Sequence, residues 1–299
     1  DDIVIGTDDD FIHLIYDDGT IGFSYQTDDK IRSAPIIIDN GNDKYVIVGS
    51  KDNHLYAVDS NGDLHFQFDS GSDIYTSPTV LETNDGNMIF FGNNEGQIYA
   101  LDLNGNLQDG FPIELMEQDI LMPFSAIVGS IVFEDINSNG LAEIIFGDEG
   151  GELHILSALD QTYSDFIHYN SMPASNTFSY SSSLSVQDLD NDGDVEIFGG
   201  TTGDLIILDI KEGSSDSSEY WGIFRNNYHR NGFISIESQC LQGDITNDGV
   251  IDILDIVTLV NAILGSTQLT DLESCAADMN GDSIVDILDI VMLVNYILN

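Results

Sequence analysis

DITNDGVIDILDIVTLVNAIL, residues 244–264, recurs with changes as DMNGDSIVDILDIVMLVNYIL, residues 278–298. Thirteen of the 21 paired positions are identical, which indicates an internal duplication. Each copy begins with regularly spaced acidic and polar residues and continues into apolar residues that recur every three or four positions. This spacing predicts an oxygen-rich loop followed by an amphipathic helix, and it predicts the pair twice.

Oxygen ligands alternate along both loops with the spacing that Ca²⁺ requires. Calcium binds about six to eight oxygens, which loop positions 1, 3, 5, 7, 9 and 12 supply, position 7 through its backbone carbonyl. The first loop places at these positions Asp244, Thr246, Asp248, Val250, Asp252 and Asp255. The second loop places there Asp278, Asn280, Asp282, Ile284, Asp286 and Asp289. We therefore expect two calcium sites, against the alternative of two acidic turns that bind no ion.

The two loops differ at position 6, where the chain has to turn sharply. The first loop has Gly249 there, whereas the second has Ser283. A non-glycine residue forced to a positive φ costs roughly 1 kcal/mol. We therefore expect the second site to be weaker or slightly reshaped.

The duplicated loop and helix resemble the dockerin family, in which a calcium loop is followed only by its exiting helix. The resemblance implies an extracellular protein, often a polysaccharide-degrading one, that docks to a cohesin-like or other surface partner. In that family loop positions 10 and 11 help to select the partner. These positions are held here by Ile253, Leu254, Ile287 and Leu288. The polar Ser/Thr pair common in cellulosomal enzymes is absent, so a cellulosome partner is in question.

The two apolar pairs are the same in both copies, so a half-turn of the module presents nearly the same chemistry to a partner. A partner is then expected to bind in either orientation. The alternative is that both pairs are buried, either between the two helices or against the rest of the chain.

The only two cysteines precede the two loops. Cys240 lies four residues before the first loop, and Cys275 lies three residues before the second. An even count beside a small domain indicates one disulfide in an oxidising compartment. The alternative is two free, buried thiols.

Residues 1–236 carry a second, looser repeat. A short apolar strand that ends in glycine recurs at Gly6, Gly49, Gly92, Gly147 and Gly199, and a turn and another strand follow each. Four short strands in every 40–55 residues or so are typical of β-propeller blades. We expect a mostly β domain, 1–236, of about five recognisable blade units in which the chain starts inside a blade. A larger ring stays open, as does a β-solenoid or sandwich. A small all-α calcium-binding domain, 237–299, follows.

Two blade turns are longer and rich in oxygen ligands. DINSNGLAE and DLDNDGDVE place ligands at positions 1, 3, 5, 7 and 9, which resembles the calcium loops of FG-GAP propellers in integrin heads and many secreted bacterial proteins. The residues are Asp135, Asn137, Asn139, Leu141, Glu143, Asp188, Asp190, Asp192, Asp194 and Glu196. We expect up to two further calcium ions that brace the blade edge. The alternative is a plain Asx-rich turn at each place.

The segment WGIFRNNYHRNGF holds the only tryptophan and resembles a Trp/Arg segment beside propellers in quinoprotein-like secreted proteins. One interpretation is an aromatic platform for a sugar or quinone, built from Trp221, Arg225, His229 and Arg230. The interpretation we favour is a closing segment that packs Trp221 on the last blade and pairs its arginines with carboxylates.

The chain is strongly acidic: 53 acidic residues against 7 basic residues give a formal net charge of −46. Such a charge repels nucleic acid and anionic membrane surfaces and favours cations. No apolar run approaches the roughly 20 residues of a membrane-spanning helix. Because the sequence contains neither an initiator methionine nor a signal peptide, we expect a mature or trimmed product. The acidic composition, rich in Asn, Asp, Gly and Ser, favours an extracellular or cell-surface location.

Catalytic motifs are absent from the sequence: it has no GxSxG, no HExxH and no Cys/His pair. We therefore expect a non-catalytic, calcium-binding assembly protein rather than an enzyme. Two alternatives remain, a dockerin-tethered polysaccharide lyase on a propeller and a structural subunit that self-assembles into a surface layer or filament. A lyase would need a basic residue near its substrate, and the chain has only seven lysines and arginines.

Overall fold

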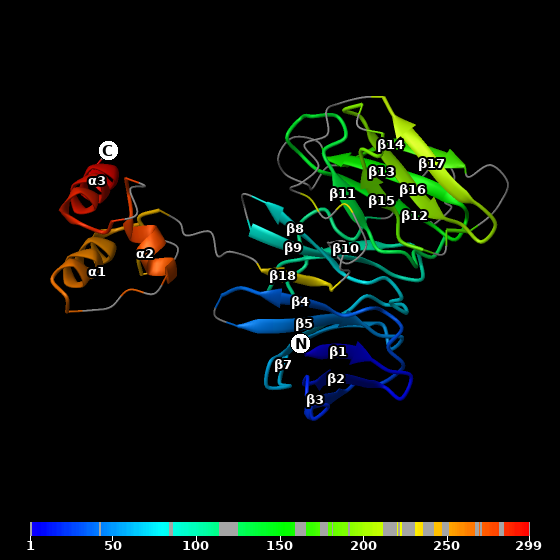
Figure 1. The fold of residues 1–299 in the computed structure, drawn as a ribbon, viewed down its shortest axis with the longest axis horizontal. Coiled ribbons are helices and arrows are strands. Elements are labelled where there is room, and N and C mark those ends of the chain that lie inside the picture. The colour runs from blue at the N-terminus through cyan, green and yellow to red at the C-terminus, as the bar shows by residue number, and fades with distance from the viewer. Residues whose placement is uncertain are drawn as a thin grey trace. The chain divides into compact units, whose positions relative to one another are not determined.

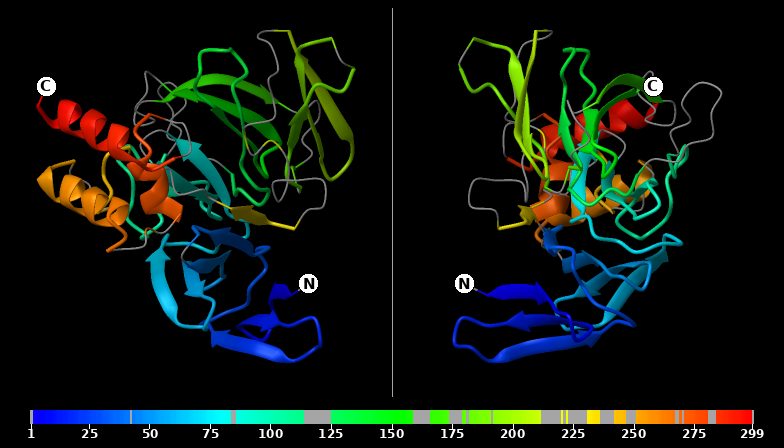
Figure 2. Two further views of the ribbon diagram at one scale, coloured as in Figure 1. Left: turned by 60° about the vertical axis from the view of Figure 1, so that its left-hand side comes forward. Right: turned by 90° about the vertical axis from the view of Figure 1, so that its right-hand side faces the viewer.

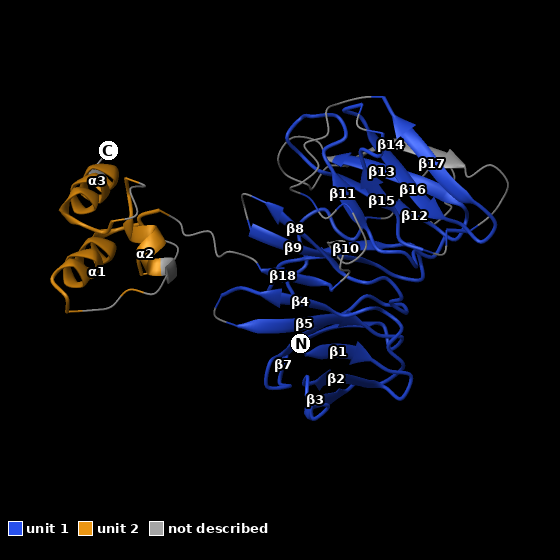
Figure 3. Cartoon of the chain, viewed as in Figure 1, with its two compact units in different colours: residues 1–236 blue, residues 237–299 orange. Residues whose placement is uncertain are grey.

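The structure is a computed structural model that describes most of the chain. The described residues are 2–41, 43–83, 86–113, 125–158, 166–173, 179–180, 182–190, 192–211, 220, 222, 231–235, 242–246, 251–266, 269, 271–280 and 284–298. The chain forms two compact units, Asp1–Ile236 and Glu237–Asn299 (Figure 3). The first, unit 1, is built of strands and the second, unit 2, of helices.

Unit 1 is a series of five small sheets that follow one another along the chain (Figure 1). Blade 1 contains β1 (Ile3–Gly6), β2 (Phe11–Ile15) and β3 (Ile21–Gln26). Blade 2 contains β4 (Ile36–Asp39), β5 (Lys44–Gly49), β6 (His54–Asp59) and β7 (Leu64–Asp69). Blade 3 contains β8 (Thr79–Thr83), β9 (Gly86–Gly92) and β10 (Ile98–Leu101). Blade 4 contains β11 (Val132–Glu134), β12 (Glu143–Gly147), β13 (Glu152–Ala158) and β14 (Phe166–Pro173). Blade 5 contains β15 (Ser185–Gln187), β16 (Val195–Gly200) and β17 (Leu205–Ile210).

Consecutive strands within each blade pair antiparallel, as short hairpin turns require. One late strand, β18 (Phe233–Ser235), joins blade 2 by pairing parallel with β4. The mostly β, propeller-like architecture predicted from the repeat is confirmed. The first strand of blade 1, β1, ends in the repeated glycine and so corresponds to β5, the second strand of blade 2.

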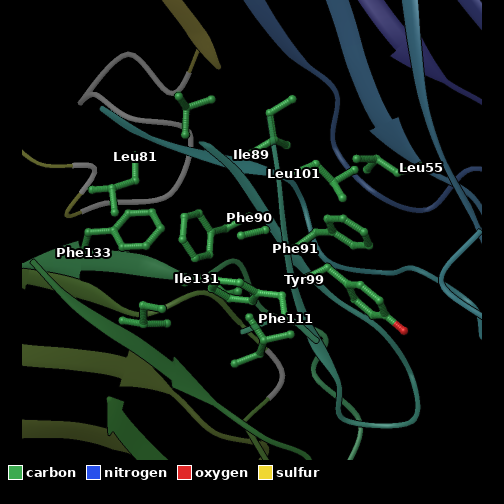
Figure 4. Packing of buried hydrophobic residues seen from close by; sticks show 14 of the residues in the cluster. Leu55, Leu81, Ile89, Phe90, Phe91, Tyr99, Leu101, Phe111, Ile131 and Phe133 are labelled. Carbon is green, nitrogen blue, oxygen red and sulfur yellow. The ribbon is translucent and has the colours of Figure 1, made fainter. Parts of the chain in front are cut away.

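The two faces of a blade are both apolar, because each face packs against a different neighbour. In β5, Val46 and Val48 belong to the core shared with blade 1, whereas Ile47 between them belongs to the core shared with blade 3. Figure 4 shows the centre of the larger core, where Phe90 of blade 3 meets Phe133 of blade 4 edge to face at 5.0 Å. This explains why the strands read as nearly continuous apolar runs.

The repeated glycine lies where consecutive blades touch. A methyl group added to Gly49 would lie 2.2 Å from Cγ2 of Ile74, a fully buried residue at the entry to blade 3. The Ile74 backbone N–H donates to the Ser50 carbonyl at 3.0 Å in the same contact. The same pairs of glycine and bulky residue recur as Gly6 with Ile31, Gly92 with Ile127, and Gly147 with Tyr180. Close approach, rather than turn formation, therefore requires the glycine.

In blade 5 the equivalent glycine is one residue later than the sequence repeat indicates. The repeated glycine pairs across the hairpin with an apolar residue, as Gly147 does with Leu153. In blade 5 the residue in this register is Gly200, which pairs with Leu205. Gly199 instead lies against Leu184 of its own blade. Two adjacent glycines made this ambiguous in the sequence.

Blades 1 and 5, the first and last of the series, each leave one apolar face uncovered by the described residues (Figure 2). Leu205 of blade 5 is 70% exposed, although its counterpart Leu153 in blade 4 is 3% exposed. At the other end Ile3 of blade 1 is 56% exposed, although its counterpart Val46 in blade 2 is 5% exposed. These two faces are the two unmatched halves of the contact that joins the other blades.

The described residues of unit 2 form three helices, α1 (Ile253–Ile263), α2 (Asp271–Ala277) and α3 (Ile287–Leu298). The helices α1 and α3 follow the two loops, as predicted, and lie side by side (Figure 2). The short α2, which leads into the second loop, was not predicted, because seven residues are too few to show an amphipathic period. The buried core contains Ile245, Leu259, Ala276, Ala277 and Leu293. Among the described residues, no helix is long and apolar enough to cross a membrane.

We predict that Gly49→Ala destabilises unit 1 by roughly 1–3 kcal/mol, since an extra methyl group in a packed contact must displace its neighbour. Urea unfolding followed by the fluorescence of the single tryptophan measures this. The double variant Gly49→Ala/Ile74→Ala should lose less free energy of unfolding than the sum of its single variants. Simple additivity of the two losses would show that the glycine is not required by the Ile74 contact.

Candidate functional site

The carboxylate at position 12 closes the first loop of unit 2. Asp255, fully buried in the first turn of α1, accepts hydrogen bonds from the backbone N–H groups of Thr246 at 2.9 Å and Asp252 at 2.8 Å. The Thr246 hydroxyl donates a third at 3.0 Å. Asp252 caps α1 by accepting from the Leu254 N–H at 2.7 Å. One carboxylate therefore joins loop positions 3 and 9 to the start of the helix.

The second loop repeats this arrangement. Asp289 is also fully buried and accepts from the backbone N–H groups of Asn280 at 3.3 Å and Asp286 at 2.8 Å. Asp286 accepts from the Leu288 N–H at 2.7 Å, as Asp252 does from Leu254. The bond that spans the loop is longer here than in the first loop. The expectation that the second site is weaker or slightly reshaped stays a prediction, because Gly249 and Ser283 lie outside the described residues.

Several predicted residues lie outside the described residues, and predictions about them stay predictions. They are the loop residues Asp248, Val250 and Asp282, the cysteine Cys240, and the segment residues Trp221, Arg225, His229 and Arg230. Of the two position-1 residues, Asp244 is buried and Asp278 is partly buried, and Ile284, predicted to supply the position-7 carbonyl, has an exposed side chain.

The helices α1 and α3 carry apolar side chains on their outer sides, and the two sets match closely. Ile253 and Ile287 are 68% and 67% exposed, and Leu254 and Leu288 are 54% and 56% exposed. Other exposed apolar residues on the two helices are Val257, Ile263, Val291, Met292 and Tyr296. Within unit 2 the two pairs are therefore not buried between the helices.

In unit 1 the long turn of blade 4 folds around two carboxylates. Glu143 accepts from the Ile136 backbone N–H at 2.6 Å, and Asp135 accepts from the Gly140 N–H at 2.8 Å. The other oxygen of Glu143 accepts from the Asn137 amide at 2.7 Å and from the Ser157 hydroxyl at 3.0 Å. The Asn137 amide therefore donates to the oxygen that an ion would otherwise contact.

The predicted ligands Asn139 and Leu141 lie in the same turn. The Asn139 side-chain oxygen accepts from the Leu141 backbone N–H at 2.8 Å, which is an ordinary Asx turn. In this loop the residues expected from the spacing lie together, and they hydrogen-bond to one another.

The long turn of blade 5 makes the same two backbone hydrogen bonds to carboxylates as that of blade 4, but the surroundings of its glutamate are different. Glu196 accepts from the Leu189 N–H at 2.7 Å, and Asp188 accepts from the Gly193 N–H at 3.1 Å. Oxygens of Asp188, Asp190 and Glu196 all lie within 4.8 Å of one another. Glu196 is 5% exposed, and its second oxygen has no hydrogen-bond partner among the described residues. A buried, unpaired carboxylate oxygen among other carboxylates fits a cation.

The residues predicted as ligands at positions 5 and 7 of this turn, Asp192 and Asp194, lie close to a lysine side chain. Lys211 lies 2.8 Å from Asp192 and 3.6 Å from Asp194. The hydrogen bond from Lys211 lowers the pKa of Asp192. The structure therefore gathers positions 1, 3 and 9 around one point and turns the position-5 carboxylate toward a cationic side chain.

A carboxylate that the sequence analysis missed lies beside the blade 4 turn. Glu134 pairs across the strands with Glu143, is 2% exposed, and has one oxygen without a partner among the described residues. Burial and then the charges of Asp135 and Glu143 raise the pKa of Glu134 to about 7. Burial likewise raises the pKa of Glu143 to about 7. The equivalent of Glu134 in blade 5 is the neutral Gln187.

Comparison with protein families matches residues 242–298 to the family described as "Dockerin type I domain". Residues 242–298 are a dockerin type I domain. Dockerin domains bind calcium and dock to cohesin, so the match makes both an expectation for residues 242–298. Dockerin modules occur in extracellular proteins.

Solved structures resemble the propeller-like unit that precedes the dockerin. The C-terminal domain of Pseudomonas aeruginosa PilY1 is similar with a TM-score of 0.53 and 15% identity, over 81% of this chain and 61% of that chain. BamB from Moraxella catarrhalis is similar with a TM-score of 0.48 and 15% identity, over 71% of this chain and 56% of that chain. The WD40 beta propeller domain of Doa1 is similar with a TM-score of 0.45 and 14% identity, over 71% of this chain and 61% of that chain. At this identity the PilY1 likeness shows the fold alone. A comparison with curated proteins found no match.

Cys275, which lies on α2 of the dockerin, is disulfide-bonded. The chain contains one other cysteine, Cys240, which lies outside the described residues. The pairing of these two cysteines therefore stays a prediction.

We predict that, in the presence of a chelator, the free energy of unfolding of unit 1 falls as the pH rises from about 4.5 to about 7. Glu134 and Glu143 have a higher pKa in the folded chain than in the unfolded chain, so the folded state holds their protons more tightly across this window. At its full value the shift of one such carboxyl corresponds to roughly 3 kcal/mol.

The variant Glu134→Gln, which copies Gln187 of blade 5, should flatten this pH dependence in urea titrations. The exposed Glu149→Gln is the matched control. An unchanged slope in Glu134→Gln would show that the buried pair does not set the pH dependence.

Proposed function

We propose that this protein is a secreted, calcium-dependent, non-catalytic assembly protein. Its dockerin attaches the propeller-like unit to a cohesin-like partner on a scaffold or cell surface. The observation that carries the proposal is the dockerin at residues 242–298, whose two helices expose matching apolar pairs. The propeller-like unit then acts as the binding domain that the dockerin places at that surface.

The docking surface we propose is the outer side of α1 and α3. Contiguous exposed apolar side chains mark interaction sites on soluble proteins. Ile253 and Leu254 on α1 have exposures within two percentage points of Ile287 and Leu288 on α3. Each pair directly follows the residue that caps its helix, so each is held in the same orientation toward its loop. A partner that recognises one pair can therefore recognise the other after a half-turn of the module.

We propose two calcium ions in the dockerin and at least one in unit 1. The dockerin loops supply acidic oxygens around the buried Asp255 and Asp289. In unit 1 the blade 5 turn is the stronger candidate, because the free oxygen of Glu196 points to a missing partner. The blade 4 turn is the weaker candidate, since Asn137 and Ser157 already donate to Glu143.

The basic residues of unit 1 favour a binding role over a lyase. A lyase would need a basic group free to approach its substrate, yet most of the described basic side chains are held in ion pairs. These pairs are Arg32 with Asp8, Lys44 with Asp39, Lys51 with Asp73, and Lys211 with Asp192, Asp194 and Asp209. The hydrogen bonds that Lys211 donates to Asp192 and Asp209 raise the pKa of Lys211, which makes it a poor base.

We predict that an isolated fragment, residues 237–299, gains helix on addition of Ca²⁺. Each loop concentrates four carboxylates, whose repulsion opposes folding until a divalent ion neutralises them. Circular dichroism with Ca²⁺ and with excess EDTA measures the change. Asp255→Asn and Asp289→Asn should each weaken calcium binding, while an exposed control such as Asn295→Asp should not. Full helicity in EDTA would reject the prediction.

We predict that docking survives the loss of either apolar pair and fails when both are lost. The variants are Ile253→Asp/Leu254→Asp, Ile287→Asp/Leu288→Asp and the combination of all four. Binding to a panel of recombinant cohesins in Ca²⁺ is the measurement, with Leu107→Asp in unit 1 as the control for added charge. If one pair alone abolishes binding as fully as both, docking has a single orientation. If none of the variants matters, the docking surface lies elsewhere.

A further inference from the structure

In blades 2, 3 and 4, polar residues occupy three positions at the hairpin between the second and third strands. They lie one, five and seven residues after the repeated glycine, and in blade 3 they are Asn93, Gln97 and Tyr99. The side-chain oxygen of Gln97 accepts from the Asn93 amide at 2.9 Å and from the Tyr99 hydroxyl at 2.9 Å. This trio is neutral, and two donors serve one central acceptor.

Blade 4 replaces all three residues at once, by Asp148, Glu152 and His154. Asp148 and His154 are 3% and 1% exposed, and Glu152 is partly buried. A carboxylate oxygen of each acid and a ring nitrogen of His154 lie within 4.8 Å of one another. The equivalent positions have therefore exchanged two hydrogen-bond donors and a neutral acceptor for two carboxylates and an imidazole.

These replacements remove the donors that held the trio together. Ionised Asp148 cannot donate to the central residue as the Asn93 amide does. The ring nitrogen Nε2 of His154 faces Asp148 Oδ2 at 3.2 Å, so a proton there serves Asp148 rather than Glu152. Two carboxylates and one imidazole around a common point carry a surplus of negative charge, which a shared cation would neutralise.

We propose that Asp148, Glu152 and His154 bind one Zn²⁺ ion. Zinc takes imidazole nitrogen and carboxylate oxygen at about 2.0–2.2 Å in a tetrahedral arrangement, in which neighbouring ligand atoms lie about 3.3–3.4 Å apart. The separation of 3.2 Å between Asp148 Oδ2 and His154 Nε2 fits one edge of that tetrahedron. The nitrogen ligand favours zinc over calcium, which takes oxygen.

The surroundings hold the ligands in place. The Glu152 backbone N–H donates to Asp148 Oδ1 at 2.9 Å, which leaves Oδ2 directed toward His154. The His154 ring stacks on Phe146 with centroids 4.8 Å apart and planes 21° from parallel, so the ring orientation is fixed. Since Glu152 is the only one of the three that is partly exposed, an ion enters from its side. The ion ties β12 to β13, as the hydrogen-bonded trio of blade 3 ties β9 to β10.

Zinc binding by the full, untagged chain tests the proposal, with Zn²⁺ itself as the probe. Titrations in millimolar Ca²⁺ keep the oxygen-only sites filled, and X-ray absorption reports whether imidazole is in the first coordination shell. We expect one tightly held zinc with one imidazole ligand. The variants Asp148→Asn and Glu152→Gln copy the amides of blade 3 and preserve side-chain shape, so they should fold while losing about tenfold or more in zinc affinity.

His54→Gln in blade 2 is the matched control, because His54 lies beside Asp52 at an equivalent hairpin and should not affect zinc binding. Unfolding midpoints of each variant without zinc separate loss of a ligand from loss of the fold. Zinc that binds equally well to Asp148→Asn and Glu152→Gln is adventitious binding to an acidic surface and overturns the proposal. An absorption spectrum without imidazole, or no bound zinc in Ca²⁺, overturns it as well.

Discussion

A carboxylate that reaches back to the backbone near the start of its own loop is the interaction on which this protein depends. Asp255 and Asp289 do this in the dockerin, and Glu143 and Glu196 do it in the long blade turns. All four are buried, so the backbone N–H groups have to replace the water that each carboxylate loses. In each loop these hydrogen bonds tie the start of the loop to its buried carboxylate. A bound cation would add the neutralisation that the clustered carboxylates need.

This interaction also explains which contacts of the candidate sites could be predicted from the sequence and which could not. The spacing of Asp188, Asp190 and Glu196 predicted that their oxygens meet, because positions 1, 3 and 9 of a tight turn share one side. The spacing did not predict that in blade 4 the amide nitrogen of Asn137 donates to Glu143, at the oxygen where an ion was expected. An amide can present either its oxygen or its nitrogen to a neighbour. Glu134 was missed because it lies in the strand before the turn, and only pairing with Glu143 across the sheet brings it to the site.

The blade repeat likewise predicted the local features of the fold and not the residues that meet between blades. The glycine pattern predicted the number and order of the blades, because close contacts between blades tolerate no side chain at Gly49 or Gly147. The identity of the opposing residue was hidden, since Ile74 and Tyr180 belong to the next blade and have no fixed distance in sequence from the glycine. Contacts within a hairpin join residues that are close in sequence and can be predicted from it, whereas contacts between blades depend on loop lengths that vary.

Charge determines what the exposed apolar surfaces of such a chain can do. A net charge of −46 keeps copies of the protein apart at low ionic strength, so apolar patches on it do not lead to indiscriminate association. The apolar pairs on α1 and α3 each lie directly after a loop that calcium neutralises, which lowers the repulsion where a partner has to approach. In the proposed function, calcium would therefore act twice in the dockerin. It would let the loops fold, and it would reduce the negative potential beside Leu254 and Leu288, so that desolvating these side chains against a partner outweighs the remaining repulsion.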